Sequence, residues 1–115
     1  MNTDEAIMSA LSPLFPGAVW PNNYTGKQLE YIVYNYATLG QVYADGKPHV
    51  GKHLVQVHWF LPNGKNPNPG KLNVSKALFD SGFSWPNIEN ASDKSGQHYV
   101  FECEYINGGA FYGHT

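Results

Sequence analysis

Two segments of the chain alternate between apolar and polar side chains, and this alternation constrains the fold more than any other feature. Residues 52–61, KHLVQVHWFL, divide their side chains between two faces, with Val55, Val57, Trp59 and Leu61 on one and Gln56 and His58 on the other. Residues 98–106, HYVFECEYI, do the same, with Tyr99, Phe101, Cys103 and Tyr105 opposite His98, Val100, Glu102 and Glu104. A two-residue period is typical of β-strands that bury one face. Both strands therefore require an apolar layer to cover them.

The rest of the sequence supplies that layer. Residues 3–15 and 71–82 carry apolar side chains at helical spacing, with Thr3 as the expected N-cap of the first helix. Residues 30–38 and 84–92 are expected to be strands, and 43–51, which contains Asp-Gly and Lys-Pro, is expected to be a turn. The last two strands are expected to pair as an antiparallel hairpin.

The resulting order, α-β-β-α-β-β, predicts an α+β fold with a mostly antiparallel sheet and two helices packed on one face. Residues 1–106 are expected to form this single domain, and residues 107–115, NGGAFYGHT, a flexible C-terminal arm. The expected core consists of Ile7, Leu11, Val57, Trp59, Leu78, Phe79, Phe101 and Cys103.

Charge and composition exclude several functional classes. The 115 residues carry a net charge of −2, and all seven basic side chains apart from histidine are lysines. Arginine is preferred for phosphate and guanine recognition, so a nucleic-acid partner is not expected. The N-terminal segment lacks a basic n-region and no apolar run reaches the length of a membrane span, so we expect a cytoplasmic protein without a membrane partner.

The loop at 62–70, PNGKNPNPG, precedes a helix and superficially resembles a phosphate-binding loop. Its two glycines, Gly64 and Gly70, are separated by five residues rather than four, and Leu72 stands where a hydroxyl would be needed. Pro67 and Pro69 also lack the backbone N–H groups that hold phosphate. The sequence therefore predicts a connector and no nucleotide cofactor.

Histidines supply the only candidate for metal or hydrolytic chemistry. His53 and His58 are five residues apart on one strand and so point to opposite faces. His58, His98 and Glu102 would meet only if their strands were neighbours, in which case two imidazoles and a carboxylate could hold zinc. The alternative interpretation is a solvated polar sheet face, and we expect no metal, no cofactor and no enzymatic activity. Cys103, flanked by two glutamates, is expected to be a core residue.

Two groups of charged residues are candidates for an interface. The 43–53 segment is locally basic, and the strand at 98–106 is locally acidic, which suits contact between neighbouring subunits. Exposed loops and arms also tend to carry recognition, which adds the 62–70 loop and the C-terminal arm. The candidate interface residues are Lys47, His49, Lys52, His53, Lys65, Glu102, Glu104, Phe111 and Tyr112.

Several motifs together resemble the tail-completion or tail-terminator proteins of long-tailed bacteriophages and prophages of Gram-positive bacteria. They are YIVYNY, YADG, VQVHWF, ALFDSGFSWP and FECEY, within residues 30–106. The resemblance implies a virion structural protein that caps the head-proximal end of the tail, often as a hexameric ring. It implies the tail tube protein and the head connector as partners, assembly in the host cytoplasm, and no catalytic residues. The alternatives are a small monomeric binding module or inhibitor, and a small hydrolase using His58, His98 and Glu102.

Overall fold

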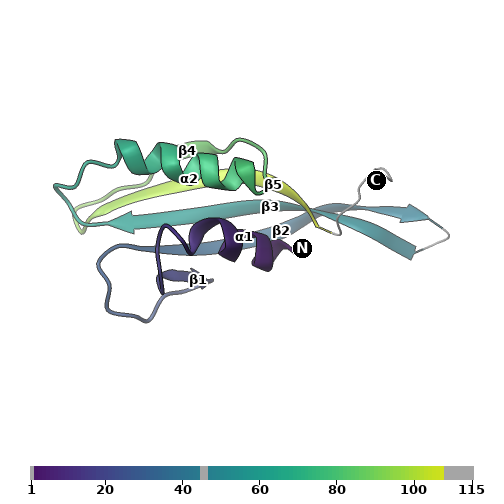
Figure 1. The fold of residues 1–115 in the computed structure, drawn as a ribbon, viewed down its shortest axis with the longest axis horizontal. Helices are drawn as coiled ribbons and strands as arrows, with labels where there is room; N and C mark the ends of the chain where they lie inside the picture. Colours follow the sequence, from purple (N-terminus) through teal and green to yellow (C-terminus); the bar gives the residue numbers. More distant parts are fainter. Residues whose placement is uncertain (1, 45–46, 108–115) are drawn as a thin grey trace.

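The protein is an α+β domain built on one five-stranded sheet (Figure 1). The computed structural model describes residues 2–44 and 47–107; for 39–44, 47–51 and 107 the description covers the backbone. The elements are α1 (Thr3–Leu11), β1 (Val19–Pro21), β2 (Tyr31–Ala44), β3 (Lys47–Leu61), α2 (Asn68–Asp80), β4 (Asn87–Asn90) and β5 (Gln97–Asn107). The sheet order is β1-β2-β3-β5-β4. The fold class expected from the sequence is confirmed.

The order of elements differs from the expected one by a single strand, β1. This three-residue strand pairs with β2 in parallel, with Val19 opposite Ile32, whereas the other three strand pairings are antiparallel. β4 and β5 form the expected antiparallel pair, although β4 is shorter than the predicted 84–92 strand. The sheet is therefore mixed, with a parallel edge on an otherwise antiparallel arrangement.

Both helices pack on the same face of the sheet and close one apolar core. Figure 1 shows α1 on the β2 side of this face and α2 on the β5 side. The alternation in β3 and β5 orients the expected faces inward, so that Val55, Val57 and Trp59 meet Phe101 and Cys103. The helices complete the cluster with Ile7, Leu11, Val74 and Leu78. This is the covering layer that the two alternating strands require.

The N-cap of the first helix lies one residue before the one expected from the sequence. Asn2, not Thr3, is the N-cap: its Oδ1 accepts from the Glu5 backbone N–H at 2.8 Å, while Glu5 Oε1 accepts from the Asn2 backbone N–H at 3.0 Å. This reciprocal pair is a capping box, which satisfies two backbone donors that the helix leaves free. Thr3 is consequently free for a buried contact with His53, 50 residues away.

The second helix presents a different face to the sheet than its sequence pattern indicates. It starts at Asn68, because Pro69 is compatible with the first helical turn. Val74 and Leu78 are buried, but Leu72 is 60% exposed and Phe79 is 54% exposed. The assignment of Phe79 to the core is therefore wrong. Leu72 and Phe79 lie seven residues apart, on a second apolar stripe that points away from the core.

The segment at 43–51 is not the expected loop but part of a long hairpin. β2 runs to Ala44 and β3 starts at Lys47, and their backbones pair through Ala44 and Lys47. β5 pairs with β3 only from Gly51 onward, and β1 pairs with β2 only at residues 32–34. The end of the hairpin is therefore a two-stranded ribbon that extends past the helices (Figure 1).

Candidate interaction surfaces and a histidine pair

The basic candidates from the hairpin do not form one free patch. Lys47 and His49 lie on β3, and their side chains fall outside the description. Lys52 is exposed, but its Nζ lies 3.0 Å from the Glu104 Oε1 on the neighbouring strand. The sequence predicts that Lys52 meets an acidic residue of a neighbouring subunit. In the structure it pairs with an acidic residue of β5 in its own chain. An exposed pair of this kind is worth little to folding stability and remains open to exchange with another chain.

His53 is buried, which corrects its assignment to an interface. Its Nδ1 lies 2.7 Å from the Thr3 Oγ1, and its ring stacks on Tyr36 with centroids 4.7 Å apart. The histidine faces α1 because it shares the odd-numbered face of β3 with Val55 and Val57. Its polar contact joins the first helix to the centre of the sheet. Only 9% of the His53 surface is exposed, too little for the partner contact expected of it.

The 62–70 loop is tied to the body of the domain by polar contacts. Lys65 pairs with Glu30, whose other carboxylate oxygen accepts from the Trp59 indole N–H at 2.9 Å. Gln97 Nε2 donates to the backbone oxygens of Pro62 at 3.0 Å and Lys65 at 2.7 Å. Loop 62–70 therefore connects β3 to α2 while bridging to β2 and β5.

The residue that would have contacted a phosphate is used elsewhere. The Lys71 ammonium sits 4.3 Å above the centroid of the Tyr99 ring, a cation–π contact. The Lys71 backbone N–H donates to the carbonyl of Pro67, inside the first turn of α2. Both groups thus have intramolecular partners.

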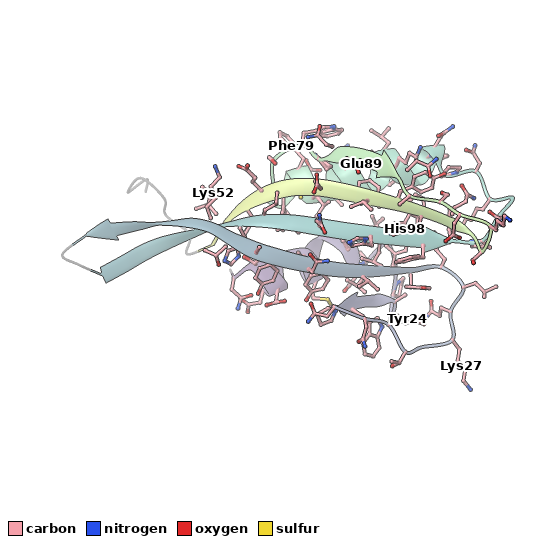
Figure 2. All side chains as sticks on the ribbon, turned by 180° about the vertical axis from the view of Figure 1, so that it is seen from behind. Tyr24, Lys27, Lys52, Phe79, Glu89 and His98 are labelled. Atoms are coloured by element: carbon pink, nitrogen blue, oxygen red, sulfur yellow. The ribbon has the colours of Figure 1, made fainter. Side chains whose placement is uncertain are left out.

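The face of the sheet opposite the helices carries a row of stacked rings. Tyr24 and Tyr31 have centroids 4.3 Å apart, Tyr31 and Phe60 4.8 Å, and Phe60 and His98 4.1 Å, with interplanar angles of 18°, 19° and 20°. Figure 2 views this face and labels Tyr24 and His98 at two places in the row. Because the rings cover one another, this aromatic row presents ring edges outward. Hollows of about 410 and 400 Å³ flank Tyr31 and Phe60.

His58 and His98 stand side by side at the end of the aromatic row. The His58 Nδ1 and His98 Nε2 are 2.9 Å apart. Burial, followed by the neighbouring His98, lowers the pKa of His58; burial also lowers the pKa of His98, against an opposing effect of Asp93. Both rings are therefore neutral near pH 7, and one donates a hydrogen bond to the other.

The third member of the predicted set, Glu102, is engaged by a different residue. Its Oε2 accepts from Gln56 Nε2 at 2.9 Å, directly across the β3–β5 pair. The two histidines come together as the sequence allowed, whereas the carboxylate turns to Gln56. Within residues 2–44 and 47–107, no group of three or more His, Cys, Asp or Glu side chains is arranged to hold a metal ion.

Cys103 has the environment of a core residue. It is buried on the helix-facing side of β5, and burial, followed by the charge of Glu104, raises its pKa to about 12. A thiol with this pKa holds its proton at neutral pH and is a poor nucleophile. The expectation that Cys103 belongs to the core is confirmed.

Exposed apolar side chains gather at the two opposite sides of the sheet. On the β4 side, Phe79 packs edge-on against Trp85 with centroids 5.6 Å apart. We call this group the β4-side patch, formed by Leu72, Phe79, Trp85 and Ile88. The second group belongs to α1, the turn after it and the first two strands. We call these four separately exposed side chains the β1-side patch: Met8, Leu14, Trp20 and Tyr36, of which Leu14 lies beside Lys65 and Asn73, Trp20 against Tyr24 and Tyr36 against His53. In the described part of the chain, the large apolar side chains of β3 and β5 are not among the exposed ones.

Sequence reasoning missed both patches, because a single residue in a loop or short strand carries no periodicity. Figure 2 labels Phe79 and Glu89 on one side of the sheet and Tyr24 and Lys27 on the other. The comparisons with known proteins give no further assignment, since no family model and no curated protein matches the chain. Neither of the two described helices is long and apolar enough to cross a membrane.

Proposed function

We propose that this protein is a non-enzymatic structural protein that caps the head-proximal end of the tail tube of a long-tailed phage and supports head–tail joining. Subunits associate side to side into a closed ring, expected to be hexameric. The tail tube protein and the head connector are its partners in the virion, and the ring assembles in the host cytoplasm. The strand and turn pattern over residues 30–106, given above, is the reason for choosing this class of assembly.

The observation that carries the proposal is the pair of apolar patches on opposite sides of one sheet. Scattered exposed apolar residues are ordinary, but a cluster with two large aromatic rings, such as Phe79 and Trp85, is typical of a protein interface. Two different patches on opposite sides allow the β4-side patch of one copy to meet the β1-side patch of the next. Such a heterologous contact repeats around a ring until it closes.

The edge strands favour contact through side chains rather than through strand pairing. β1 has three residues and ends in Pro21, which has no N–H to donate, and β4 has four residues. Short edge strands and proline both discourage the addition of another strand. Large exposed rings, by contrast, bury apolar area on contact. Glu89 and Lys27, of opposite charge, lie on opposite sides of the sheet (Figure 2).

The hairpin end of β2 and β3 gives a further reason to expect a partner. An isolated two-stranded ribbon is marginally stable in water. Here the backbone pairing continues to Ala44 and Lys47, well beyond the last β3–β5 pair at Gly51 and Asn107. A neighbouring subunit or the tail tube would cover this ribbon in the assembled particle.

A mixing experiment tests the head-to-tail contact. Phe79→Asp disables the β4-side patch and Trp20→Asp the β1-side patch; each position is exposed enough for the fold to tolerate the change. Each variant alone should remain monomeric by sedimentation analysis, while an equimolar mixture should form a 1:1 dimer through the one intact pair of patches. Lys94→Gln, at an exposed position in the turn between β4 and β5 and outside both patches, should associate like the unaltered protein. A mixture that stays monomeric while the unaltered protein associates would rule out the heterologous contact.

Deletion of the gene in its phage tests the biological role. Heads and tails should both form but fail to join, and tails should vary in length. A plasmid copy should restore infectious particles, as should the Lys94→Gln copy, whereas the Phe79→Asp copy should not. Normal particles from the deletion would contradict the proposal. A protein that is monomeric at every concentration and dispensable for joining would instead be the monomeric binding module.

A further inference from the structure

We propose that His58 and His98 form a two-ligand site for a first-row transition-metal cation, Cu²⁺ before Ni²⁺, on the open face of the sheet. The site is separate from the patches that carry the proposed assembly. His58 comes from β3 and His98 from β5, the two central neighbouring strands. Figure 2 shows His98 on the face that no helix covers.

The spacing of the two nitrogens selects the class of metal. The His58 Nδ1 and His98 Nε2 are 2.9 Å apart. Metal–nitrogen bonds of about 2.0–2.1 Å across that spacing subtend an angle of about 90° at the metal. A tetrahedral zinc site would need the nitrogens about 3.3 Å apart, from the same bond lengths. A right angle between imidazoles suits square-planar or tetragonal Cu²⁺ and Ni²⁺, and Cu²⁺ is also the tightest binder in the divalent series.

The protonation state suits metal binding near neutral pH. Asn35 Nδ2 donates to His58 Nε2 at 3.4 Å, so the ring proton of His58 is on Nδ1, directed at His98. When Nδ1 binds a metal, this proton moves to Nε2 of the same ring. The Asn35 side chain can then flip, so that its amide oxygen accepts a hydrogen bond from the Nε2–H group. No proton is lost in this exchange. Each ring can therefore present one nitrogen lone pair to the metal in its neutral form, which is the form that binds metals.

The surroundings hold both rings in place and leave room at the metal. The Phe60 ring covers one face of His98, and Asn35 lies 3.4 Å from Nε2, the second ring nitrogen of His58. A polar partner on the second ring nitrogen is what orients a metal-binding histidine. The two hollows beside the aromatic row reach one histidine each, so water can fill the remaining coordination positions. Glu102 lies on the same face, bound to Gln56, and Asp93 acts electrostatically on His98; both carboxylates favour a cation.

Copper titration of the full chain, without a histidine tag, tests the site. Isothermal titration at pH 7 should show one equivalent of Cu²⁺ that is absent in His58→Gln and in His98→Gln. Two ligands on one surface act as a chelator. Removing one of them should weaken copper binding, that is, raise the dissociation constant by about 100-fold. His49→Gln is the matched control, because it removes a histidine of β3 outside the pair. Circular dichroism should establish that all three variants are folded.

Electron paramagnetic resonance supplies a second readout. The bound Cu²⁺ should couple to two nitrogen nuclei in the unaltered protein and in His49→Gln, and to one or none in His58→Gln and His98→Gln. Ni²⁺ should compete for the same equivalent more weakly. Equal copper affinity and equal nitrogen coupling in all four proteins would overturn the proposal. So would loss of the tight equivalent in His49→Gln alone.

Discussion

Phe101 and Phe79 are two residues of one type that the sequence assigns to a single core and that the structure separates. Phe101 is fully buried in β5, with its ring centroid 6.4 Å from that of Trp59. Phe79 is 54% exposed and lies outside the core, with Trp85 edge-on beside it. Replacing each by alanine therefore removes the same atoms from two different environments.

The difference in cost can be worked out from burial. Phe101→Ala removes a buried ring and leaves a cavity, which should lower the free energy of unfolding by about 3–5 kcal/mol. Phe79→Ala removes a ring that is about half exposed, and full burial of such a side chain is worth about 1.5–3 kcal/mol, so the loss should be about 1 kcal/mol. The edge-on contact with Trp85 adds at most about 1 kcal/mol.

Urea denaturation followed by circular dichroism measures both. With a slope of about 2 kcal/mol per molar urea, Phe101→Ala should lower the midpoint by about 2 M and Phe79→Ala by about 0.5–1 M. The measurement should be made at low protein concentration. At high concentration a second copy bound over Phe79 would add stability that depends on concentration. Equal shifts for the two variants would refute the separation of the two rings. So would an unchanged midpoint for Phe101→Ala.

Three further outcomes follow from the described contacts. Gly70→Ala should lower the free energy of unfolding by about 1–3 kcal/mol, since a Cβ there would lie 2.3 Å from the Trp59 ring; an unchanged urea midpoint would contradict it. Cys103 should stay unreactive toward a thiol reagent at pH 8 in the folded protein and react once in urea, because its pKa is raised to about 12; reaction at equal rates in both states would contradict burial. The pKa values of His58 and His98 are lowered in the folded state, so the unfolded chain takes up protons first as the pH falls below about 6.5, and stability should decline there. This decline should be shallower in His58→Gln, and an identical pH profile would count against the pair.

The strand faces could be predicted from the sequence because their period is short and strict. Once residues 52–61 and 98–106 are strands, Val57 and Phe101 must share a face with their apolar neighbours, whatever the sheet order. The same logic separated His53 from His58 correctly. The strand period could not predict that the inward-facing His53 side chain forms a hydrogen bond with Thr3. That contact depends on how α1 lies across the sheet.

The orientation of α2, the existence of β1 and the extent of the β2–β3 hairpin depend on tertiary packing, and the sequence pattern indicates them only weakly. α2 carries two apolar stripes, one with Val74 and Leu78 and one with Leu72 and Phe79, and a helical period alone does not say which one faces the sheet. β1 is three residues long, too short for any periodicity, and its parallel pairing is set by the path of the chain after α1. The strands reach further into 43–51 than the turn residues indicate: only Asp45 and Gly46, the predicted turn dipeptide, stand between the end of β2 and the start of β3.

The candidate site was predictable to the same limited degree. A shared outer face and neighbouring strands bring His58 and His98 together, as the sequence allowed. The competing contact of Glu102 with Gln56 could not be foreseen without the register of β3 against β5. The edge patches depend on the exposure of single residues such as Trp85, which only the packed structure defines.

The position of β5 has a consequence for how the chain folds during synthesis. β5 is the last strand in the sequence, yet it lies between β3 and β4 inside the sheet. Until it leaves the ribosome, β4 has no neighbour to pair with, and the inward face of β3 lacks the strand that carries Phe101. The β2–β3 hairpin can form early because its contacts are local, but the contacts that close the core span nearly the whole chain. Native packing therefore waits for β5, and a nascent chain without this strand would expose apolar surface to chaperones and proteases.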